Sequence, residues 1–409
     1  MSPAAEGTRT GDFVLRGGRI IDPGQGVDGP LDLHVQDGRI AALLTPGAAM
    51  DGANDYDVSG AIVAPGLVDL HGHWYEGSPW GIDPLISLRG GVTTPCDAGT
   101  TGYENFGAFR RTIIDRSEVR VLAFLHIGSL GCASMLAGEL EDFRYVRVPE
   151  TIETILANRD TIVGVKARLG RGPCGPNVMA ALEAALEAAA GGGVPLMVHV
   201  SGGADLRAVL PRLRAGDVVT HTFIGDDGGL IFGGGDRLLP EVLDARRRGV
   251  VFDVGHGCGS FSWEIYHRAQ DQGFGFDTIS TDLHRLSVEG PVFDMLTTMS
   301  KFLHTGSSIP DIVAASTWHP AAVIGRKHEL GTLAPGRRAD VAVFGIEPGA
   351  FVFHDAFGRT ERANRRFVPL MTVNGGIVVR PDEVNVELRP YTSGDRAVGC
   401  GAPLMESAG

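Results

Sequence analysis

Lysine is scarce in this chain of 409 residues, because Lys166, Lys301 and Lys327 are its only lysines and arginine supplies the other basic side chains. The 36 basic residues face 49 acidic ones, which gives a formal net charge of -13 without a long basic stripe. Nucleic acid is therefore not expected as a partner. The rarity of lysine also makes each buried amine a candidate for a specific role.

Closely spaced cysteine pairs and long apolar runs are missing as well. The five cysteines contain no CxxC motif, which argues against a disulfide framework and against a thiolate zinc site. Residues 1–11 are small and polar, so no secretory signal is expected, and the apolar runs are too short or too interrupted to span a bilayer. We expect a cytoplasmic protein with a small-molecule substrate and no membrane partner. A homo-oligomer is compatible with the sequence, which does not determine the oligomeric state.

Strand-like segments occupy both ends of the chain. Residues 12–65 alternate short apolar runs with turns, including the hairpin signal Asp37–Gly38 between two such runs. The same pattern returns after Gly331, at Asp340–Phe344 and at Leu370–Val379. We predict a small β-sandwich domain built from both chain ends, residues 12–65 plus 332–390.

Residues 66–331 show a different pattern, in which short apolar strands alternate with helical stretches. The clearest helices are Val178–Ala190, which is rich in Ala, Leu and Glu, and Arg237–Arg248. Eight strands with crossover helices over this length predict an α/β protein with a (β/α)8 TIM barrel. The predicted strands are Val68–His73, Val92–Asp97, Arg120–Leu125, Ile162–Lys166, Leu196–Val200, Val218–His221, Val251–Val254 and Thr278–Asp282.

Two histidines stand one residue apart where the first of these strands ends. Side chains on a strand alternate faces, so His71 and His73 direct their imidazoles to one side. Neutral imidazole suits zinc. An isolated pair of this kind is weak evidence, because most surface histidines bind nothing.

Four more strand ends carry groups suited to metal chemistry: Lys166, His199, His221 and Asp282. In a barrel the carboxyl ends of the strands meet at one mouth, so all six side chains are expected to converge there. An ammonium group is repelled by a metal cation, but a neutral lysine can take up carbon dioxide and become an anionic carbamate that bridges two metals. The alternative for Lys166 is an ordinary buried lysine paired with a carboxylate.

These residues resemble those of the amidohydrolase superfamily. Residues 65–73, PGLVDLHGH, are similar to its PGxxDxHxH motif, and residues 331–344, GTLAPGRRADVAVF, to its carboxyl-terminal signature. The ligand order HxH, Lys, His, His, Asp resembles the binuclear subtype that includes dihydroorotase and dihydropyrimidinase. Local motifs around Lys166, His221, His256 and Asp282 resemble most closely the deacetylase-like branch. Gly72 and the aromatic loop Trp74–Trp80 depart from the family pattern.

The resemblance implies a cofactor of two zinc ions per chain, bridged by carboxylated Lys166. It also implies that His71, His73 and Asp282 hold one zinc ion and that His199 and His221 hold the other. Asp282 would act as general base and acid, taking the proton of a metal-activated hydroxide at attack and returning it to the leaving group.

Three further residues are candidates for substrate contacts. His256, in the glycine-flanked loop after the seventh strand, could stabilise the oxyanion as a catalytic residue, or be a loop histidine bonded to the backbone. Arg168 could pair with a substrate carboxylate or form a structural salt bridge. For His284, a hydrogen bond behind the metal ligands is favoured over direct ligation.

The favoured function is a zinc-dependent hydrolase that removes an amide- or ester-linked acyl group, with acetyl as the expected one, from a small carboxylate-bearing molecule. A cyclic amidase of the dihydroorotase or hydantoinase kind is the alternative. A non-catalytic scaffold on the same fold is a second alternative, although such relatives typically lose metal ligands. A mononuclear deaminase would not need Lys166.

Overall fold

The computed structural model describes residues 12–49, 52–134 and 137–388. Residues 1–11, which carry the prediction about a secretory signal, and residues 389–390, at the end of the predicted β domain, lie outside these ranges. No helix in the described ranges is long and apolar enough to cross a membrane.

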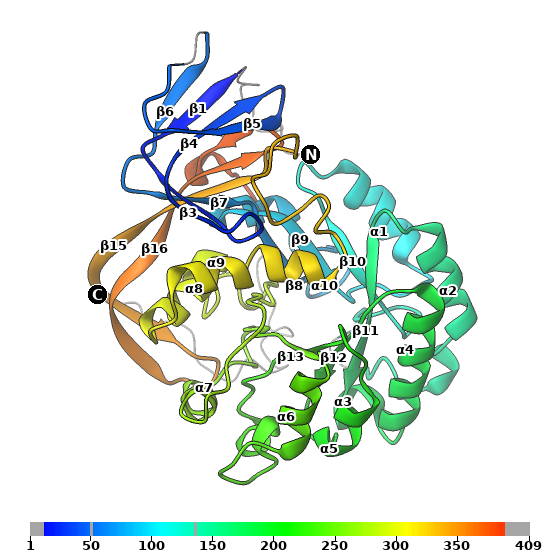
Figure 1. Ribbon diagram of the computed structural model, residues 1–409. Helices are drawn as coiled ribbons and strands as arrows, with labels where there is room; N and C mark the ends of the chain where they lie inside the picture. Colours follow the sequence, from blue (N-terminus) through cyan, green and yellow to red (C-terminus); the bar gives the residue numbers. More distant parts are fainter. Residues whose placement is uncertain (1–11, 50–51, 135–136, 389–409) are drawn as a thin grey trace.

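Parallel strands in chain order form the sheet that carries the predicted metal ligands (Figure 1). Within the described residues it has seven strands, and each pairs in parallel with the next. Their side chains are almost entirely buried, as expected for strands covered on both faces. The strands are β8 (Leu67–Gly72), β9 (Val92–Ala98), β10 (Leu122–His126), β11 (Ile162–Leu169), β12 (Leu196–Val200), β13 (Val218–Thr220) and β14 (Val251–Phe252).

The predicted eighth strand, Thr278–Asp282, is present as an irregular extended segment and not as a regular strand. It still closes the ring, because Thr278 bridges to Asp253 next to β14 and Leu283 bridges to Gly72 of β8. Two features prevent regular backbone hydrogen bonding between this segment and its neighbouring strands. The Thr281 amide donates to the Asp69 side chain, and Asp282 adopts a left-handed φ of 50°. The predicted barrel fold is confirmed. The prediction differs from the structure in its last strand, which it took to be regular and which is an irregular extended segment.

Helices surround this sheet on the outside (Figure 1). The predicted helix Val178–Ala190 is α4 (Val178–Gly192), which ends where Gly193 turns left-handed, and the predicted helix Arg237–Arg248 is the shorter α6 (Pro240–Arg247). The others are α1 (Phe106–Thr112), α2 (Val148–Ala157), α3 (Arg171–Cys174), α5 (Leu206–Val209), α7 (Trp263–Gln270), α8 (Met295–His304), α9 (Ile309–Ala315) and α10 (Trp318–Val323).

Strands from both chain ends build two further sheets. A four-stranded sheet has the order β5-β4-β1-β6, and a six-stranded sheet has the order β17-β16-β15-β7-β2-β3. Apolar residues of both, such as Phe13 and Val343, share one buried core. The strands are β1 (Phe13–Arg16), β2 (Arg19–Asp22), β3 (Val27–Pro30), β4 (Asp32–Gln36), β5 (Arg39–Leu44), β6 (Asn54–Asp57), β7 (Ile62–Pro65), β15 (Val341–His354), β16 (Thr360–Asn374) and β17 (Ile377–Val379).

Two details of these sheets differ from a simple hairpin pattern. The chain turns at Gly17, with φ of 78°, from β1 in one sheet to β2 in the other, so these neighbours do not pair with each other. The strands β15 and β16 are much longer than predicted and form an antiparallel ribbon that runs beside α7 and α8 (Figure 1). The Phe367 amide of β16 donates to the Ser300 hydroxyl of α8 at 2.8 Å. The ribbon therefore reaches the barrel, and the boundaries at residues 65 and 332 stay a prediction.

Candidate metal centre and active site

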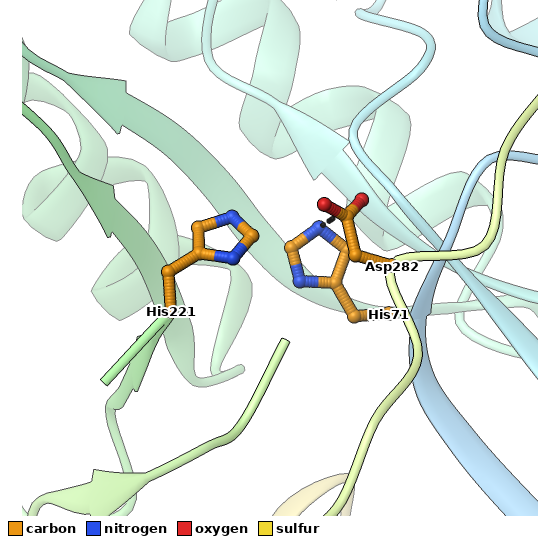
Figure 2. A group of neighbouring side chains, drawn as sticks. All are labelled: His71, His221 and Asp282. Atoms are coloured by element: carbon orange, nitrogen blue, oxygen red, sulfur yellow. Dashed lines mark ion pairs between the residues drawn. The ribbon is translucent and has the colours of Figure 1, made fainter. Parts of the chain in front are cut away.

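A cavity of about 310 Å³ opens at the carboxyl ends of the barrel strands. All six predicted metal ligands line it: His71, His73, Lys166, His199, His221 and Asp282. They lie at or near the carboxyl ends of five different strands or extended segments, with His71 and His73 at the same one, so residues up to 211 positions apart in sequence meet in one place. The nitrogen and oxygen donors of His71, His221 and Asp282 lie within 4.8 Å of one another. Figure 2 shows these three side chains as neighbours.

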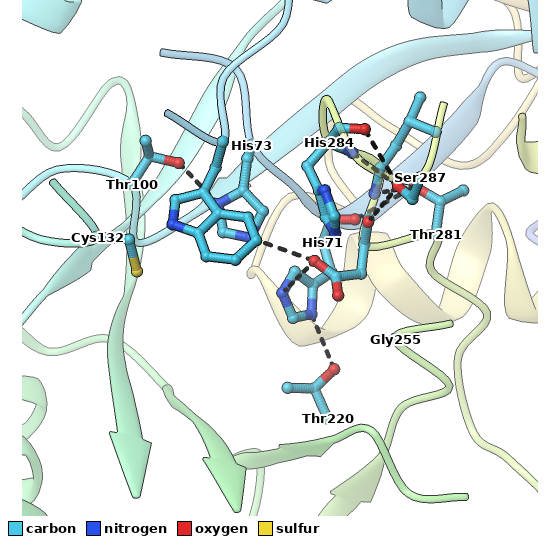
Figure 3. Close-up of polar contacts among 12 residues, drawn as sticks. His71, His73, Thr100, Cys132, Thr220, Gly255, Thr281, His284 and Ser287 are labelled. Atoms are coloured by element: carbon cyan, nitrogen blue, oxygen red, sulfur yellow. Dashed lines mark hydrogen bonds and ion pairs between the residues drawn. The ribbon is translucent and has the colours of Figure 1, made fainter. Parts of the chain in front are cut away.

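Hydrogen bonds orient the two histidines of the HxH pair (Figure 3). The Thr220 hydroxyl donates to Asp253 at 2.8 Å, so its oxygen accepts from Nδ1–H of His71 at 2.9 Å. That tautomer leaves the lone pair on Nε2, which lies 3.4 Å from Oδ1 of Asp282. The hydroxyl oxygen of Thr100 lies 2.8 Å from Nδ1 of His73, in the same arrangement as that of Thr220 beside His71. Nε2 of His73 lies 3.2 Å from Oδ1 of Asp282. Both Nε2 atoms are thus turned to one point as ligands require.

His221 and His199 face the same cavity from the next strands. Nδ1–H of His221 donates to the Gly255 carbonyl oxygen at 2.6 Å, which again leaves its Nε2 unprotonated. The rings of His199 and His221 are 4.2 Å apart between centroids. Burial is the main cause that lowers the pKa of His221 to about 4 and that of His199 well below its usual value. The histidines of the cavity are therefore neutral near pH 7, as metal ligation needs.

Lys166 lies beneath these rings, fully buried. Its Nζ is 3.2 Å from Nε2 of His71, and it also donates to the sulfur of Met197 at 3.5 Å. No carboxylate within the described residues forms a salt bridge with it, which differs from the ordinary paired lysine considered above. Burial lowers the pKa of Lys166 to about 8, so a sizeable fraction of the amine is neutral near physiological pH.

Backbone strain accompanies the site at two ligands. His221 has φ of 60° and Asp282 has φ of 50°, in the left-handed region that residues with a side chain seldom occupy. Each such residue costs about 1–3 kcal/mol, and these conformations cluster at functional sites. The amide of Asp282 donates to the carbonyl oxygen of His71 at 2.6 Å, which ties this carboxylate to the HxH segment.

The three residues predicted to contact substrate do not all lie in the cavity. Arg168 and His284 line the cavity, whereas His256 is buried outside its lining. Nδ1–H of His256 donates to the Gly257 carbonyl oxygen at 2.8 Å, and its Nε2 lies 2.6 Å from Nζ of Lys301. This placement favours the structural alternative for His256, and its role in catalysis stays a prediction. Nδ1 of His284 accepts from the Leu286 amide at 3.1 Å, so Nε2 carries the proton and suits a substrate contact better than a metal.

The aromatic loop Trp74–Trp80 contributes one side chain to the cavity, Trp80. Trp74 is fully buried, and a Cβ added at Gly72 would lie 2.3 Å from its ring. This contact accounts for the glycine between the two histidines. Cys132 also lines the cavity as a free thiol.

Several supporting residues were not predicted from the sequence. Thr100, Thr220, Asp97 and Asp253 hold the histidines, and Glu139 holds Arg168. Their positions after or within buried strands are a weak signal, because Thr and Asp are common there without a function. Their partners are distant in sequence, so only the fold reveals these contacts.

Comparison with known proteins agrees with this geometry. A family model described as the amidohydrolase family matches residues 265–378. A deacetylase of Brucella anthropi is 36% identical over 353 residues, which cover 85% of this chain and 87% of that protein. The chain belongs to the amidohydrolase family. This amidohydrolase is therefore a hydrolase that acts on C–N bonds.

Solved structures are similar over most of this amidohydrolase. The crystal structure of an adenine deaminase matches with a TM-score of 0.84 and 30% identity, covering 90% of this chain and 100% of that one. The crystal structure of a dihydroorotase matches with a TM-score of 0.83 and 33% identity, covering 90% and 99%. The resemblance to the superfamily and its deacetylase-like branch is confirmed, as is the barrel fold.

Proposed function

We propose that this amidohydrolase removes an amide- or ester-linked acyl group, with acetyl the expected one, from a small carboxylate-bearing molecule with the help of two zinc ions. The observation that carries the proposal is one cavity lined by six candidate metal-ligand side chains and the guanidinium of Arg168. The name of the relative from Brucella anthropi, a deacetylase, supports the acetyl group. Composition supports a cytoplasmic protein that acts on a small molecule and binds neither nucleic acid nor membrane.

The donor set fits zinc by its chemistry. His71 and His221 present unprotonated Nε2 atoms, and Asp282 adds an anionic oxygen within 4.8 Å of them. By family resemblance, His71, His73 and Asp282 would hold one ion, and His199 and His221 the other. Zinc, when bound, supplies Lewis-acid polarisation of the scissile carbonyl and activation of water.

Lys166 completes this donor set as a carbamate. Its neutral amine nitrogen forms a bond to the carbon of carbon dioxide and loses one proton to water, which yields an anion with two oxygens. The lowered pKa of Lys166, about 8, makes the neutral amine available for that step. The contact of Nζ with Nε2 of His71 at 3.2 Å supports a carbamate near the first histidine.

Asp282 moves the proton in the proposed reaction. Its Oδ1 lies 3.4 Å from Nε2 of His71 and 3.2 Å from Nε2 of His73, in the lining of the cavity. The carboxylate takes the proton of the attacking water and returns it to the leaving nitrogen or oxygen, a transfer that contributes about 10²–10⁴-fold. Arg168 binds the substrate carboxylate, and Nε2–H of His284 is a second donor toward the substrate.

A cyclic amidase is the second candidate function. The likeness to a dihydroorotase structure at 33% identity favours it. A scaffold without activity is disfavoured because every ligand position retains a residue able to bind metal.

A substrate panel tests the proposed function. We expect the zinc-loaded enzyme to hydrolyse acyclic N-acetyl or O-acetyl acids and to leave dihydroorotate and hydantoins intact. Turnover of ring substrates alone would show the cyclic amidase instead. Metal analysis should find two zinc ions per chain, with fewer in Lys166→Ala and two in the control Lys327→Ala, whose side chain is exposed. Protein without zinc that added zinc does not activate would falsify the metalloenzyme proposal.

A further inference from the structure

A chain of buried polar side chains outside the metal-ligand set ends at Arg168. Nη1–H of Arg168 donates to Oε1 of Glu139 at 3.0 Å, and Nε2 of His126 lies 3.6 Å from the same oxygen. The Glu139 side chain is 7% exposed and that of His126 is fully buried, whereas Arg168 is 25% exposed and reaches the cavity. The ion pair therefore sits directly behind a wall of the active site.

The protonation of His126 follows from its backbone contact. Nδ1 of His126 accepts the Gly128 amide at 2.9 Å, so in the neutral ring the proton is on Nε2, which faces Glu139. At 3.6 Å this contact is electrostatic and not a hydrogen bond. Burial lowers the pKa of His126 to about 4, which keeps the ring neutral at pH 7.

The donor atoms of His126, Cys132 and Glu139 lie close enough together to hold a metal ion, but their chemistry opposes it. Nε2 of His126 carries a proton, and the Glu139 carboxylate is already paired with a guanidinium. Burial raises the pKa of the Cys132 thiol to about 12, so it is not a thiolate. These three side chains therefore do not form a metal site, and the role that their contacts indicate is to hold the Arg168 guanidinium in place.

We propose that Glu139 and His126 are positioning residues that fix Arg168 by one edge and present its remaining N–H groups to the cavity as a subsite for a carboxylate. This inference rests on the proposed function, since the ligand is the carboxylate of the acid substrate. A guanidinium has five donors in a planar fork, so it can hold Glu139 and a second carboxylate at once. The His126 ring limits rotation of the Glu139 carboxylate away from Arg168.

The subsite lies close to the metal ligands. Arg168 pairs in strand register with His199, and it lines the same cavity as His73 and His199. An anion on Arg168 is thus next to the atoms that carry the reaction. Charged hydrogen bonds of this kind correspond to roughly 10- to 100-fold in affinity, which sets the size of the expected preference for an acid over its neutral amide.

Binding of two probes that cannot be hydrolysed tests the subsite. The probes are 4-oxopentanoate, in which CH2 replaces the NH of N-acetylglycine, and its neutral counterpart 4-oxopentanamide. Calorimetry on the zinc-loaded protein should show tighter binding of the acid by about tenfold or more. Arg168→Met should remove this preference, which separates the guanidinium from direct carboxylate binding to metal.

Variants of Glu139 distinguish positioning from competition for Arg168. Glu139→Ala should weaken acid binding by about tenfold, whereas Glu139→Gln, whose carbonyl oxygen accepts the same hydrogen bond, should retain it. If Glu139 only competed with the ligand, Glu139→Ala would bind the acid more tightly, and the proposal would be overturned. The control is Glu141→Ala, because Glu141 is exposed in the same loop. His126→Leu should act as Glu139→Ala does, and His126→Gln, which keeps a donor, should restore binding.

Kinetics with acyclic N-acetyl acids provides the second readout. Glu139→Ala should raise KM about tenfold and leave kcat nearly unchanged, because the contact is the same in ground and transition states. A protein that prefers the acid probe but hydrolyses no panel member would keep the subsite and refute the proposed function. A protein without acid preference, or with the same preference in Arg168→Met, would refute the subsite even if hydrolysis occurs.

Discussion

At the scale of single residues, the hydroxyl of Thr220 decides which nitrogen of His71 faces the cavity. Thr220 donates to Asp253 and accepts from Nδ1–H of His71, so the lone pair remains on Nε2. Thr220→Val should therefore lower zinc affinity by about 10- to 100-fold, the usual effect of losing a partner behind a ligand. Competition with a chromophoric chelator measures the affinity. Thr220→Ser should retain it, and so should Thr222→Val, because the Thr222 hydroxyl bonds only to backbone oxygens.

The six ligand positions could be predicted from the sequence because each lies at or near the carboxyl end of an apolar strand-like segment. His199 and His221 illustrate this, since the strand pattern alone brought them to one mouth. Thr100 and Glu139 could not be predicted in this way, because their partners His73 and Arg168 lie 27 and 29 positions away. Contacts of that kind depend on how loops turn back over the barrel, which periodicity does not encode.

At the scale of elements, the glycine-containing loop after β14 lies directly against the side chain of Asp282, a proposed metal ligand. Gly257 has φ of 52°, and a Cβ added there would lie 2.3 Å from Oδ2 of Asp282. Gly257→Ala should displace this carboxylate, with loss of bound zinc and at least a tenfold fall in kcat/KM. Gly273→Ala is the matched control, since Gly273 has φ of 72° with open space around its Cβ. Both should lose about 1–2 kcal/mol of stability from the left-handed backbone, but only Gly257→Ala should lose metal. Equal zinc content in the two variants would contradict this contact.

The strands that sequence reasoning placed best are those with a strong local signal. The hairpin of β4 and β5 forms around Asp37 and Gly38, both with positive φ, as the turn pattern predicts. The segment 278–282 departed from a regular strand because Asp69 and Asp253 compete for its polar groups. The length of the β15–β16 ribbon was missed, since its outer half packs one face on α8 and leaves residues such as Val352 exposed.

At the scale of the whole molecule, the barrel holds several neutral histidines in its interior. Burial is the first cause that lowers their pKa, to about 4 for His73 and His221. Residues 66–331 could be assigned to a barrel from the βα period, but which titratable side chains become buried depends on the packing of the folded chain. The histidines with lowered pKa, all buried except the partly exposed His199, are His71, His73, His126, His199, His221, His256 and His284.

These histidines predict that the metal-free protein loses stability in mild acid. Between about pH 6.5 and 4 the unfolded chain binds protons that the folded protein excludes, so the free energy of unfolding falls as the pH falls. Asp69, whose pKa burial raises to about 7, acts in the opposite direction, as do Asp97, Asp253 and Asp294. Since seven histidines outnumber four aspartates, the net effect is a loss of about 1.4 kcal/mol per pH unit for each net proton. Urea unfolding of the chelator-treated protein at pH 7.5, 6 and 5 measures it, and equal or higher stability at pH 5 would contradict the assignment of neutral, buried imidazoles.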